Sequence, residues 1–219
     1  MRRAALSNLD CRSESGCETA VHGLTGMETP SFDPPRAGRL ECAMWVAYYR
    51  REWVALLRSA VFLIRHVLGL SWPSSIRASW FVLRATKLWA PVPDNDPVAA
   101  RLAMGRFFRL VTQHYDESFD AAEAARLEVE WWRVHREDQH SNGDSDQRAL
   151  VDALVALYAY AFGLPDAAVR GAAEQRALAM RYSDQWVRDG CDLESPLIAR
   201  QRSALVSSYA GVLATVHRR

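Results

Sequence analysis

The sequence predicts an all-α protein, a single compact helical bundle of about seven helices preceded by a disordered N-terminal tail. Apolar residues recur at helical spacing along almost all of residues 39–219, and no stretch there alternates as a half-buried strand does. Capping residues and prolines stand where several helices should begin. The length of 219 residues and the 49% hydrophobic content suit one domain with a substantial core.

Residues 1–38 form the predicted tail. They are rich in Ser, Thr, Gly and Pro and show no sustained period, and residues 29–35 have the composition of a linker. Met27 lies within this tail and is an alternative start of the chain. We therefore expect residues 39–219 to hold the whole helical domain.

Capping residues place the helices in order. Ser71 and Pro73 begin the second helix, and Asp96 is the N-cap of the third. Asp120 and Glu123 form a capping box for the fourth. The seven predicted helices span residues 39–69, 73–89, 97–115, 121–139, 147–162, 165–190 and 196–219.

The composition excludes several classes of protein. A net charge of +1 argues against a strongly basic nucleic-acid binder, although residues 39–90 hold eight basic and two acidic side chains. Residues 53–70 are very apolar, but Arg58, Arg65 and His66 carry too much charge for a membrane-spanning helix. Arginine supplies 26 of the 27 basic residues, which is typical of a GC-rich bacterial genome.

Cysteine usage and the N-terminal sequence predict a cytoplasmic protein. None of the four cysteines has a partner at CxxC spacing, so neither a zinc site nor a disulfide framework is expected. The first residues contain no apolar stretch of the kind found in a secretory signal. Reduced thiols in the cytoplasm are the simplest interpretation.

The helix predicted at residues 121–139 carries the most informative pattern. On a helical wheel, charges of alternating sign gather within one narrow arc, as on an exposed face. These residues are Glu123, Arg126, Glu130, Arg133 and Glu137. The opposite face must then point inward, and its candidate ligand-binding residues are Glu128, Trp131, Trp132, His135 and Gln139.

An inward-facing Glu128 needs a partner or a raised pKa, because burying an isolated carboxylate costs several kcal/mol. Arg176 lies on the apolar face of the helix at residues 165–190, together with Ser183. We expect Arg176 to form a two-pronged ion pair with Glu128. Arg202, in the last helix, competes for the same role.

Other polar residues on apolar faces give weaker signals. On the first predicted helix, Glu52 and His66 share a stripe that either lines a pocket or marks an edge between helices. His114 projects with apolar residues and is interpreted as a core histidine. Asp152 lies either inside or on a narrow exposed strip of a nearly apolar helix.

Common catalytic and cofactor-binding motifs are missing. The sequence contains no GxGxxG, P-loop, HExxH or GxSxG pattern, and it lacks the paired Glu-x-x-His motifs of di-iron bundles. No metal-ligand set is assigned and the cofactor stays unknown. Glu128 and His135 are nevertheless candidate catalytic residues if they share a pocket.

Three functions compete. We favour a non-catalytic module that binds a small molecule or a partner protein through a buried Glu/His/Arg cluster. The first alternative is an enzyme, with or without a metal, that uses Glu128 and His135. The second binds nucleic acid or an anionic membrane through Arg51, Arg58 and Arg65, with nucleic acid the less expected partner. A homodimer stays open, because seven short helices are a small body in which to bury eight tryptophans.

Overall fold

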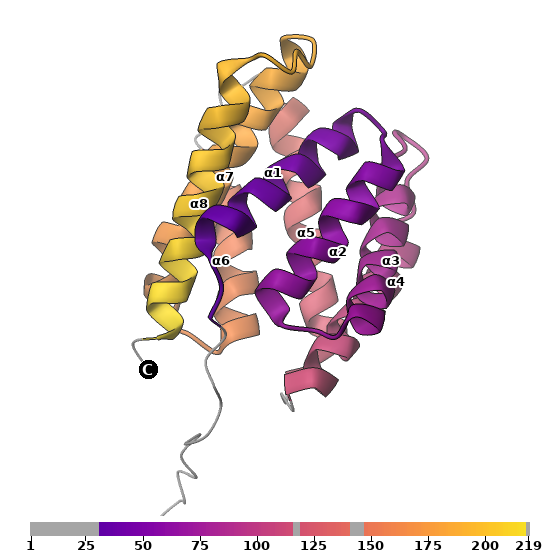
Figure 1. Cartoon of the computed structure of the whole chain (residues 1–219), viewed down its shortest axis with the longest axis vertical. Coiled ribbons are helices and arrows are strands. Elements are labelled where there is room, and N and C mark those ends of the chain that lie inside the picture. The colour runs from indigo at the N-terminus through magenta and orange to yellow at the C-terminus, as the bar shows by residue number, and fades with distance from the viewer. Residues whose placement is uncertain (1–30, 116–118, 141–146, 218–219) are drawn as a thin grey trace, which may run out of the picture.

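The computed structural model describes residues 31–115, 119–140 and 147–217. Within these ranges the chain forms eight α-helices and no strand, which confirms the all-helical prediction (Figure 1). Most of the predicted tail lies outside the described residues. The helices are α1 (Pro34–Tyr49), α2 (Trp53–Leu68), α3 (Trp72–Trp89), α4 (Pro97–Tyr115), α5 (Ala121–His140), α6 (Arg148–Phe162), α7 (Asp166–Arg188) and α8 (Pro196–Val216).

The long first helix expected at residues 39–69 is two helices. α1 ends in a Schellman motif, in which the Glu52 N–H donates to Ala47 O at 2.8 Å and the Arg51 N–H donates to Tyr48 O at 3.0 Å. Arg51 adopts the left-handed conformation that this motif needs, with φ of 58°. Glycine usually fills that position, so an arginine there gives no stop signal in the sequence.

α1 also begins earlier than expected. The Asp33 side chain accepts a hydrogen bond from the Arg36 N–H at 3.1 Å, and Pro34 occupies the first helical position. Residues 34–38, predicted as tail, are therefore helical, and Gly38 is buried against α8. A Cβ atom at Gly38 would lie 2.6 Å from Val206 Cγ2, so only glycine permits this approach.

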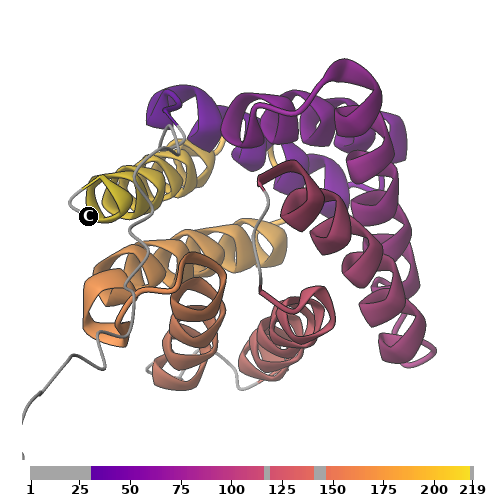
Figure 2. The same ribbon diagram turned by 90° about the horizontal axis from the view of Figure 1, so that it is seen from below.

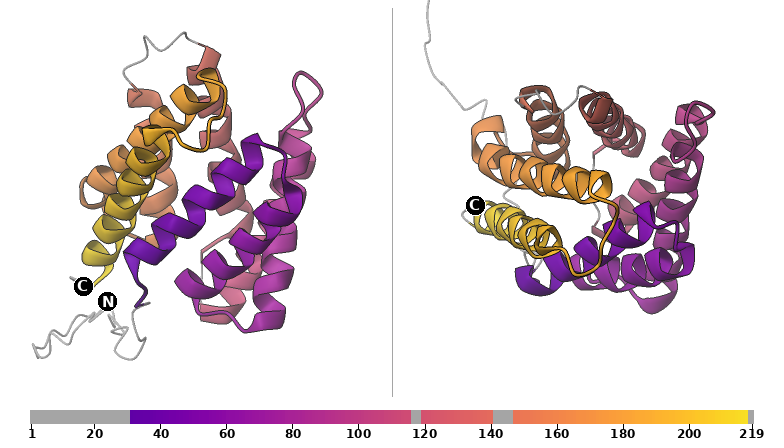
Figure 3. Two further views of the ribbon diagram at one scale, coloured as in Figure 1. Left: turned by 45° about the horizontal axis from the view of Figure 1, so that its top comes forward. Right: turned by 90° about the horizontal axis from the view of Figure 1, so that it is seen from above.

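The eight described helices close into a ring. Each helix packs against its neighbours in sequence, and α1 packs against α8. Seen along the bundle from either end, the helices follow one another around the ring (Figures 2 and 3). The short connections make consecutive helices antiparallel, as Figure 1 shows for α1, α2 and α3. A ring of this kind turns one face of every helix towards a shared centre.

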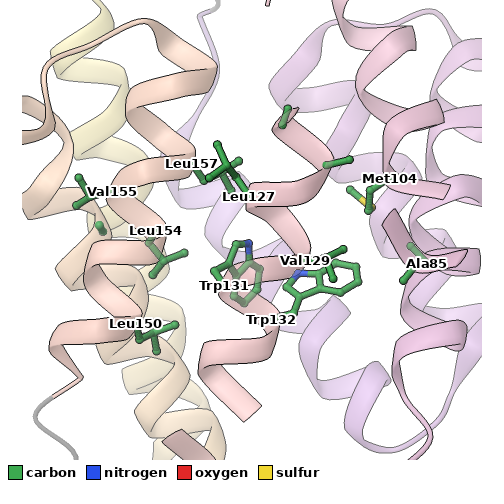
Figure 4. Close-up of a cluster of buried hydrophobic side chains, with 14 of the residues drawn as sticks. Ala85, Met104, Leu127, Val129, Trp131, Trp132, Leu150, Leu154, Val155 and Leu157 are labelled. Carbon is green, nitrogen blue, oxygen red and sulfur yellow. The ribbon is translucent and has the colours of Figure 1, made fainter. Parts of the chain in front are cut away.

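α5 is a central wall of the largest apolar core. Its Leu127 and Trp131 face Leu154 of α6, while Trp132 faces α3 and α4, where Ala85 and Met104 lie (Figure 4). Apolar packing on both sides of α5 fixes its rotation about its own axis. The helix consequently presents a defined set of residues to the centre of the ring.

The outer face of α5 carries the predicted ladder of charges. Glu123 pairs with Arg126 at 2.7 Å and Glu130 with Arg133 at 2.8 Å, and Arg133 also pairs with Glu137. These side chains are between a third and two thirds exposed. The helical wheel therefore assigns the exposed and inward faces of α5 correctly.

The interpretation of His114 as a core histidine is wrong. Its side chain is exposed and its ring lies edge-on to Tyr115, with the centroids 4.8 Å apart. No residue from 109 to 115 is buried, because the last two turns of α4 are only partly covered. Asp152 is exposed and pairs with Arg170 at 3.0 Å. Among the described helices, none has the length and apolar content needed to cross a bilayer.

Candidate functional site

A cavity of about 390 Å³ lies at the centre of the ring and is partly open to the outside. All eight helices contribute side chains to its wall, which is mostly aromatic and aliphatic. Protein interiors leave few voids larger than one water molecule, so a space of this size is unusual for a packed core. It falls within the range of pockets that bind small molecules.

Arg176 of α7 and Glu41 of α1 form an ion pair on the cavity wall. Arg176 Nη1 donates to Glu41 Oε2 at 3.2 Å, and Nη2 donates to Oε1 in a second hydrogen bond. The Glu41 side chain is only 2% exposed. The Arg176 guanidinium carbon lies 5.6 Å from the Trp45 ring centre and 5.8 Å from that of Trp131, which adds cation–π attraction.

Glu128 of α5 lies next to this ion pair. Its Oε1 accepts a hydrogen bond from Trp132 Nε1 at 3.1 Å. The Trp131 indole N–H faces the same carboxylate without reaching hydrogen-bonding geometry. Burial raises the pKa of Glu128, while the positive charge of Arg176 and the two indole groups oppose that rise. We call Glu41, Glu128 and Arg176 the guanidinium cluster.

The guanidinium cluster holds two acidic side chains and one basic side chain. Burial by itself would lower the pKa of Arg176, but the charge of Glu41 raises it well above its ordinary value. Arg176 is therefore charged. Within the described residues Glu128 has no cationic group within 4 Å, so the single guanidinium is committed to Glu41. Two tyrosines adjoin the cluster, and burial raises the pKa of both Tyr158 and Tyr209.

A second polar group surrounds Asp184 of α7, whose side chain is 7% exposed. Asp184 Oδ2 bonds to His135 Nε2 at 3.0 Å. Asp184 Oδ1 accepts from Gln139 Nε2 at 2.6 Å and from the Tyr49 hydroxyl at 3.4 Å. We call these four residues the histidine cluster.

The histidine cluster fixes the imidazole of His135. A carboxylate at Nε2 places the ring proton there and leaves Nδ1 as the basic nitrogen. Gln139 Nε2 also donates to the Tyr49 hydroxyl at 3.0 Å, which closes the network. Burial, and then the charge of Asp184, raises the pKa of Tyr49, so its hydroxyl stays protonated. His135 and Glu128 are seven residues apart, about 10 Å along the helix axis.

Six of the residues selected from the sequence meet at the cavity. They come from α5 and α7 and belong to the two clusters or to the aromatic wall beside them. They are Glu128, Trp131, Trp132, His135, Gln139 and Arg176. The inward orientation of Glu128 and His135 is the feature on which the sequence-based site depended, and both side chains line the wall.

Three other selected residues lie away from the cavity. Ser183 is buried within α7 without reaching the wall. Glu52 is exposed at the start of α2 and pairs with Arg50 at 2.7 Å. His66 Nε2 lies 3.0 Å from the backbone oxygen of Asp33, so this side chain attaches the chain before α1 to α2. We leave these three residues out of the site.

The partner predicted for Arg176 is wrong in detail. The two-pronged ion pair is made with Glu41, and Glu128 interacts with Arg176 only through its nearby charge. Arg202, the competitor, is exposed on α8. The first helix was predicted to begin at Arg39, which placed Glu41 in its first turn, where too few neighbouring residues were helical to show which way the side chain points. Glu41 was therefore not recognised as an inward-facing acid.

Sequence reasoning also missed Asp184 and Tyr49. Asp184 stands at helical spacing from Ala177 and Met180, which are both buried, and that spacing is the available signal. Glu41 gives a similar signal, four residues after the buried Ala37. Tyr49 gives none, since a tyrosine near a helix end suits a core or an interface equally well.

The proposed arginine stripe on the first helix does not exist as one helical face. Arg51 lies in the turn between α1 and α2, while Arg58 is exposed on α2. Arg65 donates to Leu70 O at 2.7 Å and stacks over the Trp72 ring at 4.6 Å. The prediction of this stripe required one unbroken helix, and the Schellman motif divides that segment into α1 and α2.

In the part of the chain that the structure describes, no three His, Cys, Asp or Glu side chains come together as a metal site. Cys42 is buried and Cys191 is partly buried, and both are thiols rather than disulfide partners. Burial raises the pKa of the Cys42 thiol to about 11. Such a thiol is a poor nucleophile at neutral pH.

Comparison with family models, with curated proteins and with solved structures found no match for this chain. Any functional conclusion therefore rests on the cavity and its two polar clusters.

Proposed function

We propose that this protein binds a small, largely apolar organic molecule in the central cavity, in the bacterial cytoplasm that its composition predicts. The observation that supports this proposal most strongly is the cavity itself, which has a volume of about 390 Å³ and is lined by all eight described helices. Binding pockets combine an apolar lining with a few convergent polar groups, and the two clusters supply those groups here.

The apolar part of the wall supports this proposal. It includes Leu56 and Ile64 of α2, Met104 and Phe107 of α4, and Leu157 of α6. Burying apolar ligand surface against these side chains would contribute about 25 cal/mol per Å². The polar clusters would orient the molecule rather than provide most of the affinity.

Cavity-filling substitutions test the proposal directly. Ala161 lines the cavity from α6, so Ala161→Phe places a ring in the space that a ligand would use. Ala156 lies on the exposed face of the same helix, and Ala156→Phe is the matched control. The neutral fluorophore N-phenyl-1-naphthylamine is the probe, titrated against the full chain, with circular dichroism to verify folding.

We expect saturable one-to-one fluorescence enhancement for the natural chain and for Ala156→Phe, and a loss of at least tenfold in affinity for Ala161→Phe. If Ala161→Phe does not fold, Met44→Trp fills the same cavity from α1. Absence of saturable binding by the natural chain, or unchanged affinity in a folded cavity-filled variant, would contradict the proposal.

A second candidate function is an enzyme, and the pairing of His135, which lines the wall, with the buried Asp184 behind it favours this function. An imidazole oriented by a carboxylate is the usual form of a general base. The two functions differ in the fate of the molecule. A compound extracted from the purified protein and returned to it stays unchanged for a binding module. Time-dependent conversion that His135→Gln abolishes would instead identify an enzyme.

A further inference from the structure

The guanidinium cluster is electrostatically incomplete. Glu41 and Glu128 both lie beside Arg176, and the ion pair of Arg176 is made with Glu41. Glu128 receives one hydrogen bond, from Trp132 to Oε1, and its Oε2 accepts none from the described residues. A carboxylate enclosed by protein is stabilised when a cation pairs with it. Among the described residues no second cation comes within 4 Å of Glu128, since the other arginine on the wall, Arg136, donates to Trp89 O at 2.7 Å and stacks over the Trp89 ring.

The aromatic side chains around Glu128 are suited to a cation. Trp131 and Trp132 flank it on α5, and Trp45 lines the cavity from α1. Indole rings are the strongest cation–π partners among protein side chains. Arg176 already uses this property, because its guanidinium lies within 6 Å of the ring centres of both Trp45 and Trp131. The same wall can therefore stabilise a second positive charge.

An unsatisfied polar atom lies at the same place. The Trp131 indole nitrogen is buried with no hydrogen-bond acceptor, in a side chain that is 9% exposed. Buried indole N–H groups normally find a partner. This N–H faces the Glu128 carboxylate and opposes the rise in its pKa, so it favours the ionised carboxylate with which a bound cation would pair.

We propose that the molecule bound in the central cavity is an apolar amine, whose protonated nitrogen lies against the Glu128 carboxylate and the neighbouring indole rings. This inference rests on the proposed function and names its ligand class. The apolar remainder of the amine would lie along the aliphatic and aromatic part of the wall. Burial raises the pKa of Glu128 in the empty cavity, and an adjacent ammonium group would lower it again.

Three probes of equal length and different charge test the ligand class: 4-phenylbutylamine, 4-phenylbutan-1-ol and 4-phenylbutyrate. Each displaces N-phenyl-1-naphthylamine from the full natural chain at pH 7.5. We expect the amine to bind on the order of tenfold or more tightly than the alcohol, and the anionic carboxylate to bind most weakly. This order requires no variant and so does not depend on how a substitution folds.

Substitutions then assign the preference to one residue. Glu128→Gln keeps an acceptor for Trp132 but removes the charge, and we expect it to abolish the preference for the amine while changing the alcohol affinity less than threefold. Glu130→Gln, on the outer face of α5, should leave the preference intact.

The outcomes separate this inference from the proposed function. Equal binding of amine and alcohol, or a preference that survives in Glu128→Gln, would overturn the amine and leave a binding cavity. Failure of all three probes and of the fluorophore would overturn the proposed function itself.

Discussion

The two polar clusters beside the cavity satisfy their charges in different ways. In the histidine cluster one carboxylate, Asp184, is surrounded by His135, Gln139 and Tyr49, and both of its oxygens are used. In the guanidinium cluster two carboxylates share one cation, and Glu128 keeps an open oxygen. The comparison teaches that the first network is complete without a ligand, whereas the second is open to an additional charge.

Removing the shared cation should produce the largest effect. In Arg176→Met the carboxylates of Glu41 and Glu128 are left enclosed with no opposing charge. Loss of one partner of a buried ion pair costs about 3–5 kcal/mol, so we expect the free energy of unfolding to fall by that amount. Urea titration at pH 7.5, followed by circular dichroism, measures it.

The matched control is Arg133→Met on the outer face of α5. Arg133 makes two ion pairs with Glu130 and Glu137, but its side chain is 48% exposed. Exposed pairs contribute about 0.2–1 kcal/mol each because water screens them. Equal losses in Arg176→Met and Arg133→Met would show that the guanidinium cluster is not sequestered from water.

An intermediate effect is expected in the histidine cluster. Asp184→Asn keeps one oxygen acceptor but replaces the other by an NH₂ group, which cannot accept a hydrogen bond from His135 Nε2. Disrupting a buried hydrogen bond to a charged group costs about 1–3 kcal/mol, so the variant should be less damaged than Arg176→Met.

Thermal melts of Asp184→Asn beside Asp152→Asn measure this difference. Asp152 pairs with Arg170 on the surface of the bundle and is 62% exposed, so its substitution should hardly change the melting temperature. Similar melting temperatures for the two variants would mean that the histidine cluster contributes no more than an exposed ion pair.

The sequence predicts the helices better than it predicts the partners within the site. The alternating charges of α5 identify its inward face correctly, because solvent exposure leaves a periodic record in one helix. The partner of Arg176 depends instead on which helix closes the ring beside α8. That contact requires a buried Gly38 at the end of the segment predicted as a disordered tail.

The break between α1 and α2 shows the same limit. Local propensity favours continuing the helix through residues 50–52, and the packing of α2 back on α1 overrides it. Arg51 accepts a left-handed conformation there, which no sequence pattern announces. Partners that depend on tertiary closure, such as Glu41, are therefore the ones that sequence reasoning misses.

The smallest expected effect is the dependence of stability on pH that Glu128 causes. Burial raises the pKa of Glu128 above its ordinary value of 4.5, so the folded state holds this proton to a higher pH than the unfolded state. Well below pH 4.5 both states are protonated, so stability is at its full value and does not change with pH. As pH rises from 4.5 towards the folded pKa, the unfolded state binds fewer protons, and stability falls. Above the folded pKa the loss is constant.

Glu128→Gln cannot ionise but still offers an oxygen to Trp132, so it should gain stability relative to the natural chain as pH rises from 4.5 to 8. Urea titrations of both proteins across this range measure the difference. Glu130→Gln is the control, because hydrogen bonds from Arg133 lower the pKa of Glu130 and its stabilising charge is lost only as pH falls below 4.5. This variant should therefore show no trend against the natural chain between pH 4.5 and 8. If the natural chain instead becomes more stable than Glu128→Gln as pH rises, the negative charge of Glu128 is already balanced by positive groups of the protein. The guanidinium cluster would then be as complete as the histidine cluster.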